Sequence, residues 1–329
     1  MSVDSTRKIF DTKTILNSAS AARLRIAMYV RHTPLIKASY FTKYKFKLLN
    51  LKLENMQFTG SFKIRGAYNH ILSLSEEQKQ LGVVVASGGN HGLSVAFAGR
   101  KLNIPVTVFL PENASQSRKD RISFWGANIT CFGKSPTDAI PAAKEFAAKN
   151  NRYFIHPFDS EKTIEGTTTL GLEILEDVPD MDLIFVAVGG GGLLAGIASV
   201  LKSVNPKIHI VGVDIAARPK LTLSLKEKKI ITVDPLPTIA DTLGPTALSQ
   251  LTFDLCSQFV DEVVQVTESE LVEAMKDLWL DTNQLVEPAG AAVLAACKNY
   301  PEAAKYAKAV AVICGGNADV KSVFERYNV

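Results

Sequence analysis

The stretch "DLIFVAVGGGGLLAG" (182–196) has the most informative pattern in the chain, an apolar run that passes through four glycines into a helix-like segment. Its apolar half is typical of a strand covered on both faces, as in parallel sheets. The glycines leave the N–H groups of residues 189–193 unscreened at a helix N-terminus, where amides and the helix dipole bind phosphate. A tight turn would need only one or two glycines, so the pattern favours a phosphate site.

Strand-like runs rich in valine, isoleucine and phenylalanine alternate with amphipathic segments along the rest of the chain. This alternation predicts an α/β, doubly wound architecture with mainly parallel sheets. Ligands bind such sheets at the carboxyl ends of the strands, which makes the strand-to-helix loops the informative places. The expected strands lie within 46–54, 82–87, 105–111, 128–133, 152–157, 182–190, 208–214, 263–267 and 309–316, and the expected helices include 61–75, 91–102, 136–149, 164–176, 193–203, 268–282 and 288–298.

Composition narrows the class of protein. The 329 residues are 47% hydrophobic, which is enough for a large core in two domains or in one large domain. The 37 basic and 33 acidic residues form no long basic run, so we expect no nucleic-acid surface. The sequence has no apolar run of about 18 residues and no secretory signal pattern, which predicts a cytoplasmic protein without a membrane span. The four cysteines form no CxxC pair and lie near no histidine at metal-ligand spacing, so no metal site is predicted.

A second loop, "SGGNHG", begins at Ser87, after a strand and before a helix. The side chains of Ser87 and Asn90 and the bare amides of Gly88 and Gly89 supply hydrogen-bond donors at a positive helix end. Such a cluster suits a small carboxylate. His91 either contacts the ligand or only occupies the first helical turn, and the residues leave both possibilities open.

A third loop, "CGGN", follows the last expected strand and places Cys314 at its carboxyl end. A buried thiol is more often a small apolar filler than a reactive group. Lys63 is more unusual, because in "ENMQFTGSFKIRGAYNH" (54–70) it stands where a loop becomes a helix. Since a cation is unfavourable at a positive helix end, Lys63 either points to solvent or has a chemical role.

A lysine, a phosphate turn, a carboxylate pocket and a neutral group at a strand end together meet the needs of pyridoxal 5'-phosphate (PLP). The motifs "SFKIRGA", "SGGNHG", "VGGGGLLAG", "VEPAGA" and "CGGN" occur in the order found in the threonine/serine dehydratase and serine racemase family, which the chain resembles from His32 to Val320. The resemblance implies a fold-type II PLP enzyme, similar to the tryptophan synthase β subunit. It also implies a large cofactor-binding domain, 1–75 and 161–329, and a small substrate-closing domain, 76–160.

The resemblance further implies roles for the matched residues. Lys63 would join the cofactor covalently and would be the catalytic residue. Phe62 would pack against the cofactor ring, Asn90 would bond its phenolic oxygen, and Cys314 would meet its pyridine nitrogen. The cofactor phosphate would bind Gly189, Gly190, Gly191, Gly192 and Leu193, and the substrate carboxylate would bind Ser87, Gly88, Asn90 and His91.

The implied activity is that of a PLP-dependent serine/threonine-type dehydratase, an ammonia-lyase that converts a β-hydroxy amino acid into a 2-keto acid and ammonia. The thiol of Cys314 cannot keep the pyridine nitrogen charged, so the carbanion is short-lived and β-elimination is favoured. A serine racemase is an alternative, although the racemases carry a second serine after Ser87 where this chain has Gly88. The resemblance also implies a homodimer with a small amino-acid substrate and no C-terminal regulatory domain.

A nicotinamide-dependent oxidoreductase is a further alternative. Gly190, Gly192 and Ala195 spell G-x-G-x-x-A, and Asp214 ends the next strand about 20 residues on, as in a dinucleotide-binding fingerprint. The fingerprint leaves Lys63 and the loop from Ser87 without a role. Whether a cation binds near Asp214 stays open, because the residues that follow it include an arginine and a lysine, and the exact amino-acid substrate stays open too.

Overall fold

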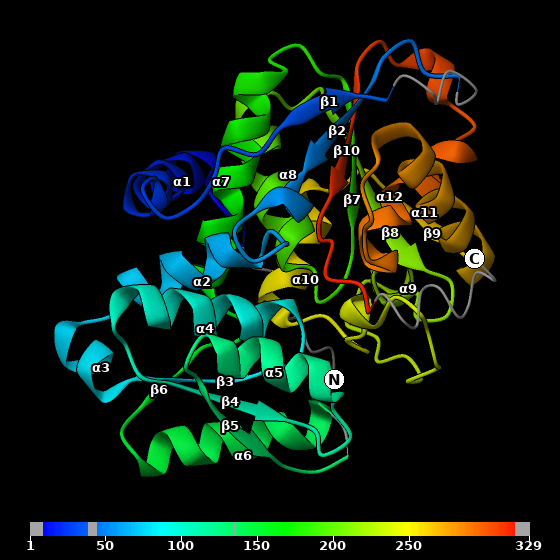
Figure 1. Ribbon diagram of the computed structural model, residues 1–329. Helices are drawn as coiled ribbons and strands as arrows, with labels where there is room; N and C mark the ends of the chain where they lie inside the picture. Colours follow the sequence, from blue (N-terminus) through cyan, green and yellow to red (C-terminus); the bar gives the residue numbers. More distant parts are fainter. Residues whose placement is uncertain (1–8, 39–44, 135, 320–329) are drawn as a thin grey trace, which may run out of the picture.

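The computed structural model describes residues 9–38, 45–134 and 136–319, and it contains two sheets with helices on both faces (Figure 1). The larger sheet has the strand order β1-β2-β10-β7-β8-β9, and the smaller sheet has the order β5-β4-β3-β6. All strand pairs are parallel except β1 with β2. The predicted α/β, doubly wound class is therefore confirmed.

The larger sheet carries helices on both faces (Figure 1). On one side lie α1 (Thr12–Ile26), α7 (Glu161–Asp177), α8 (Gly192–Val204) and α10 (Gln250–Phe259), and on the other side lie α11 (Glu268–Thr282) and α12 (Pro288–Lys298). Helix α9 (Lys220–Glu227) packs against β8 and β9. The strands are β1 (Leu35–Lys37), β2 (Leu49–Leu53), β7 (Leu183–Ala187), β8 (His209–Ile215), β9 (Glu262–Val266) and β10 (Ala309–Ile313).

The smaller sheet uses a single stretch of the chain. Its strands are β3 (Val83–Ala86), β4 (Val106–Leu110), β5 (Asn128–Cys131) and β6 (Tyr153–Phe154). Helix α6 (Pro136–Lys149) covers one face, and α4 (Asn90–Leu102) and α5 (Gln116–Phe124) cover the other. Helix α2 (Lys63–Leu72) contacts both α4 and α7, so it joins the helix layers of the two sheets. Helix α3 (Glu76–Leu81) and the short 3-10 helices η2 (Glu54–Met56), η3 (Asp241–Leu243) and η4 (Ala303–Lys305) complete the described elements.

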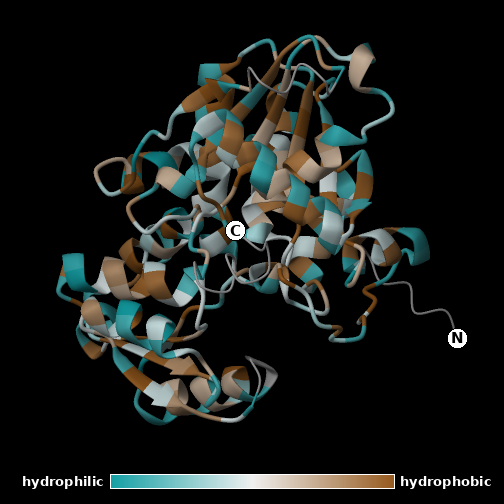
Figure 2. Cartoon of the chain, turned by 45° about the vertical axis from the view of Figure 1, so that its right-hand side comes forward, coloured by the Kyte–Doolittle hydropathy of each residue, from teal (hydrophilic) through white to brown (hydrophobic). Residues whose placement is uncertain are grey.

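Apolar side chains fill the space between the sheets and their helices. Strands β2, β7 and β10 are buried along their whole length, which explains the continuous apolar sequences of β7 and β10. One core surrounds the larger sheet, and two smaller ones lie on the two faces of the smaller sheet. In Figure 2 the strands are mainly brown, and teal segments lie mostly on the outer helices and loops. In the part of the chain that the structure describes, no helix is both long and apolar enough to cross a membrane.

Hydrogen bonds fix the start of α2 at the carboxyl end of β10. The N–H of Phe62 donates to the carbonyl of Cys314 over 3.1 Å, and the N–H of Gly316 donates to the carbonyl of Gly60 over 2.8 Å. These bonds place Lys63, the first residue of α2, among the carboxyl ends of the strands, where ligands bind in such folds.

Each strand and helix expected from the sequence is present. Strand β1 was not predicted, because three residues are too few to show a pattern. Helices α1, α3, α5, α9 and α10 also lie outside the expected set. The smaller sheet runs from Val83 to Phe154, within the range 76–160, and the proposed closing of this region over substrate stays a prediction.

Candidate active site

Lys63 has the environment of a reactive amine rather than of a surface charge. Its Nζ donates to the carbonyl oxygen of Pro157 over 2.9 Å, in the segment between β6 and α7. Burial lowers the pKa of Lys63 from 10.5 to about 8, although Cys314 and Glu287 act in the opposite direction. A lysine with this pKa supplies the neutral amine near neutral pH far more readily than an ordinary lysine does.

A small pocket joins Lys63 to the glycine turn after β7. The walls come from α2, from the segment before α7, from α7 itself and from the start of α8. Lys63 and Gly192, at the end of the glycine turn, therefore line the same pocket. The lining residues are Phe62, Lys63, Gly66, Pro157, Thr163, Thr167, Gly192 and Leu193.

The glycine turn, which we call the β7 turn (residues 188–192), presents only backbone groups. Gly191 has a φ of +86° and stands at the N-cap of α8 without a side-chain cap, so the first amides of the helix stay free. A Cβ added to Gly190 would lie 2.3 Å from the ring of Phe158, so only glycine fits there. The hydroxyl of Thr167 donates to the carbonyl of Gly192 over 2.9 Å and holds the turn in place. Free amides at an uncapped helix end suit a phosphate.

The loop after β3, which we call the β3 turn (residues 87–91), also leads into a helix without a side-chain cap. Asn90 is buried, and its Nδ2 donates to Oε1 of Glu287 over 2.7 Å. Its Oδ1 accepts a hydrogen bond of 2.7 Å from Nδ2 of Asn317. The Oγ of Ser87 accepts from the N–H of Gly89 over 3.3 Å, and this hydroxyl can still donate to a ligand.

The ring of His91 is turned toward the protein interior. It is buried, and its Nε2 lies 3.4 Å from the carbonyl oxygen of Ile155. Burial lowers the pKa of His91 well below 6.5, so the ring is neutral. The backbone N–H of His91, in the first turn of α4, is the group of this residue that suits a substrate carboxylate.

Glu287 lies next to Asn90 and Thr242, although its sequence pattern indicated no role for it. Its Oε1 accepts hydrogen bonds from Asn90 and, over 3.3 Å, from the hydroxyl of Thr242. Burial raises the pKa of Glu287 to about 7, and within the described residues its Oε2 has no hydrogen-bond partner. The available signal was its place in "VEPAGA", where an acidic residue precedes the proline that begins α12.

Cys314 lies directly after β10, as predicted, and is buried. Its Sγ donates to the carbonyl of Ala289 over 3.5 Å. Burial raises the pKa of the Cys314 thiol, and the neighbouring Glu287 acts in the same direction. The group at this strand end is therefore a neutral thiol that carries no charge for a ligand nitrogen.

The donor set fits pyridoxal phosphate. The amides of the β7 turn suit its phosphate, and the amine of Lys63 suits its aldehyde. Ser61 Oγ, His91 Nδ1 and Glu287 Oε2 are among the buried atoms of the described residues that have no hydrogen-bond partner. Ser61 precedes Lys63 by two residues, His91 follows Asn90, and Glu287 accepts a hydrogen bond from Asn90. Because buried polar atoms are normally satisfied, this group of atoms indicates a polar ligand.

Comparison with known proteins also indicates pyridoxal phosphate. Residues 26–315 match the family described as pyridoxal-phosphate dependent enzyme. The chain belongs to this family. It is 38% identical to the L-threonine ammonia-lyase of Thermotoga maritima, over 94% of this chain and 77% of the relative. It is also 38% identical to the L-threonine dehydratase catabolic TdcB of Staphylococcus aureus, over 94% of this chain and 90% of the relative.

Solved structures of family members share the fold. Maize serine racemase has a TM-score of 0.90 and 34% identity, and the match covers 95% of this chain and 96% of that chain. The processed threonine deaminase isoform 2 of Solanum lycopersicum has a TM-score of 0.91 and 30% identity, with coverage of 96% and 89%. Because structures with both names share this fold, the choice between lyase and racemase depends on individual residues of the site.

The residue that completed the dinucleotide-binding fingerprint is not available to a ligand. Asp214 is fully buried, and its Oδ2 accepts from the N–H and the hydroxyl of Thr222 over 2.9 and 3.0 Å. Its Oδ1 lies 3.6 Å from Nζ of Lys220. A ribose hydroxyl cannot reach such a carboxylate, which speaks against the nicotinamide alternative.

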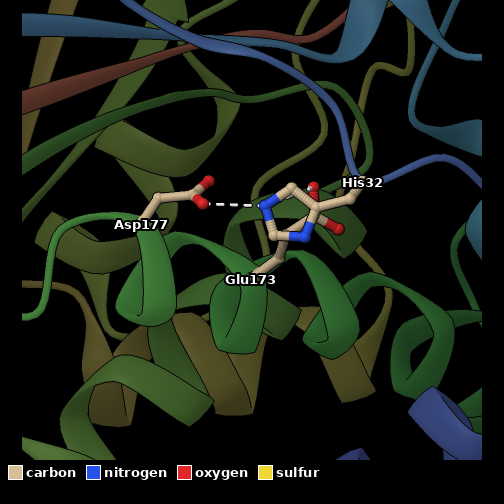
Figure 3. A group of neighbouring side chains, drawn as sticks. All are labelled: His32, Glu173 and Asp177. Atoms are coloured by element: carbon tan, nitrogen blue, oxygen red, sulfur yellow. Dashed lines mark hydrogen bonds and ion pairs between the residues drawn. The ribbon is translucent and has the colours of Figure 1, made fainter.

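Outside the pocket, three neighbouring side chains are of the types that bind metal ions, but they form an ion-pair network. His32, Glu173 and Asp177 lie close together, and Nε2 of His32 is 2.7 Å from Oδ1 of Asp177 (Figure 3). The Nζ of Lys52 lies 2.7 Å from Oε1 of Glu173 and 2.6 Å from Oδ2 of Asp177, and Arg65 lies 2.8 Å from Oε2 of Glu173. Two cations of the chain already neutralise these carboxylates, so the group offers little attraction to a metal ion.

Proposed function

We propose that this protein is a PLP-dependent ammonia-lyase that converts a β-hydroxy amino acid, threonine or serine, into a 2-keto acid and ammonia. The observation that carries the proposal is the amine of Lys63, whose pKa burial lowers to about 8, in a pocket that reaches Gly192. Relatives named for threonine deamination, 38% identical over most of the chain, support the same reaction.

Each part of the site would hold one part of the ligands. The amides of the β7 turn would bind the cofactor phosphate, and Phe62 would pack against the cofactor ring. The N-terminus of α4 and the hydroxyl of Ser87 would bind the substrate carboxylate. The second hydrogen of Asn90 Nδ2, beyond the one given to Glu287, would be donated to the cofactor's ring oxygen.

When bound, the cofactor supplies an electron sink for the negative charge that develops at the substrate α-carbon. The neutral amine of Lys63 would take the α-proton and hold it on Nζ. A pKa near 8 suits this task, because a base that works near neutral pH must lose its own proton there. The Cys314 thiol would leave the negative charge weakly stabilised, which favours loss of the β-hydroxyl as water.

A substrate screen tests the proposal. The purified protein, loaded with PLP, is incubated with L-threonine, L-serine and other β-hydroxy amino acids, while ammonia and keto acid are measured. We expect both products in equal amounts from at least one of these substrates. A PLP-loaded protein that releases neither product from any of them would contradict the lyase assignment.

Gly88 favours the lyase over the racemase. It has no side chain that could carry a proton, and it stands where racemases have a second serine. Chiral analysis of the same incubations separates the two activities. Accumulation of D-serine without keto acid would show that the protein is a racemase.

The homodimer implied by the resemblance, and the cytoplasmic location, stay predictions. Sedimentation of the purified protein would test the first, because a homodimer would have twice the chain mass of 35.7 kDa. Fractionation of the source cells would test the second.

A further inference from the structure

Lys220, the first residue of α9, is fully buried next to the β7 turn. A buried ammonium is costly unless oxygen atoms surround it. The Nζ donates to the carbonyl oxygens of Val188 and Leu243, over 3.0 and 3.4 Å, and lies 3.6 Å from Oδ1 of Asp214. Three oxygen atoms thus lie within 3.6 Å of Nζ, and two of them accept hydrogen bonds from it. We call these three oxygen atoms the oxygen cage.

The oxygen cage brings together three segments that border the active site. Val188 directly precedes Gly189 of the β7 turn. Leu243 follows Thr242, whose hydroxyl donates to Glu287. Asp214 is the penultimate residue of strand β8. One ammonium therefore links the phosphate side of the site to the side of Glu287 and Asn90.

The cage has the chemistry of a cation site. One oxygen of Asp214 is satisfied by Thr222, whereas Oδ1 has no hydrogen-bond partner within the described residues. The cation nearest to this oxygen is the ammonium of Lys220. A carboxylate oxygen and two carbonyl oxygens are also the ligands that hard inorganic cations prefer.

We propose that the side-chain ammonium of Lys220 serves as the cation of the cofactor site. The ammonium fills the oxygen cage in place of a small inorganic cation, and it holds the β7 turn and the Thr242 segment in the geometry that binds the cofactor phosphate. Lys220 is a positioning residue, because it acts through Val188 and Leu243. Without the lysine side chain, the cage becomes a binding site for a small inorganic cation.

Two variants of Lys220 test the proposal, with PLP affinity and the melting temperature of the cofactor-free protein as readouts. Lys220→Ala empties the cage, and Lys220→Met fills it with an uncharged side chain of similar length. We expect both variants to bind PLP about tenfold more weakly and to melt at lower temperature. Titration with KCl, MgCl₂ or CaCl₂ should restore Lys220→Ala in a saturable manner, whereas Lys220→Met should not respond.

The controls separate a specific cation from general effects of salt and charge. Ionic strength is kept constant with choline chloride, whose cation is too large for the cage. Lys226→Ala, on the exposed side of α9, should match the wild type, and neither protein should respond to added cations.

Two results would overturn the proposal. If Lys220→Met bound PLP as tightly as the wild type, the ammonium would be unnecessary, and this result is decisive even if Lys220→Ala does not fold. If no small cation restored a folded Lys220→Ala, the cage would not be a cation site. Both readouts require only folding and cofactor binding, so they do not depend on which amino acid the enzyme deaminates.

Discussion

Two turns of this molecule join a buried parallel strand to a helix without a side-chain cap, one after β7 and one after β3. The four glycines of the β7 turn offer only backbone groups, and Phe158 lies so close to Gly190 that no side chain would fit. The β3 turn carries the side chains of Ser87 and Asn90. Asn90 is held by Glu287, which belongs to the helix layer of the other sheet.

The difference has a physical reason if the turns hold phosphate and substrate as proposed. A cofactor phosphate stays bound through many reaction cycles, so amides fixed in advance by packing serve it best. A substrate enters and leaves in every cycle. Side-chain hydrogen bonds between the two sheets can break and form again as the site opens and closes. The same strand-to-helix geometry thus suits a permanent ligand or an exchanging one, depending on what the turn presents.

Removal of the Lys63 amine, which lies between the two turns, should have the largest effect on activity. Lys63→Ala should lower the rate of ammonia release by a factor on the order of 10³ or more, because the general base is lost. It should also abolish the visible absorption of the lysine-bound cofactor. The β7 turn keeps its amides, so PLP should still bind noncovalently, as gel filtration with phosphate analysis would show. Activity near that of the wild type would contradict the proposed base.

A side chain added to the β7 turn should weaken the binding of the cofactor. Gly190→Ala places a Cβ 2.3 Å from the ring of Phe158, and overpacking of this kind costs about 1–3 kcal/mol, or roughly 5–150-fold in the Kd for PLP. Gly189→Ala is the matched control, because its nearest contact would be 3.4 Å from the carbonyl of Thr242. Equal PLP affinities of the two variants, measured by fluorescence titration, would show that the turn is not rigid.

A substitution of Glu287, which holds Asn90 of the β3 turn, should alter the pH dependence of kcat/KM. The pKa of Glu287 is raised to about 7, so the carboxylate that accepts from Asn90 is lost as the pH falls through about 7. We expect wild-type kcat/KM to fall over that range and the profile of Glu287→Gln to lack this step. Glu227→Gln, at an exposed position of α9, should keep the wild-type profile. An identical step in Glu287→Gln would assign the titration to another group.

The smallest expected effect is on stability and concerns α2, which contacts α4 and α7. Burial lowers the pKa of His70 from 6.5 to about 4. Between these values the unfolded chain binds a proton that the folded protein does not, so the free energy of unfolding decreases as the pH falls from 6.5 to 4. His70→Gln should reduce this slope by about 1 kcal/mol per pH unit, measured by denaturant unfolding. His156, whose pKa burial also lowers to about 4, should leave part of the slope in place. Equal slopes in variant and wild type would contradict a neutral His70.

Sequence patterns located the turns because each is a local feature. Four consecutive glycines after an apolar run, and donors such as Ser87 and Asn90 after another, can be recognised without knowledge of the fold. Lys63 was recognisable because a cation at a helix start conflicts with the helix dipole. The side chain of His91 could not be assigned, because its direction depends on packing against Ile155, which follows β6.

Other members of the site gave no local signal. Glu287 was visible as part of a motif, but its partner Asn90 lies 197 residues away. Lys220 resembled a flanking charge near Asp214, and only the folded chain places its Nζ against the carbonyls of Val188 and Leu243. Phe158 had no pattern that connects it to Gly190.

The sequence by itself determined the alternation of strands and helices, the two uncapped turns and the lysine that begins α2. These features follow from periodicity and backbone chemistry over a few neighbouring residues. Only the tertiary structure decided that Glu287 holds Asn90, that Phe158 closes the side of Gly190 and that Lys220 fills the oxygen cage. The reason is that parallel strands bring distant segments together at their carboxyl ends, and the partner of each side chain there depends on the order of the strands.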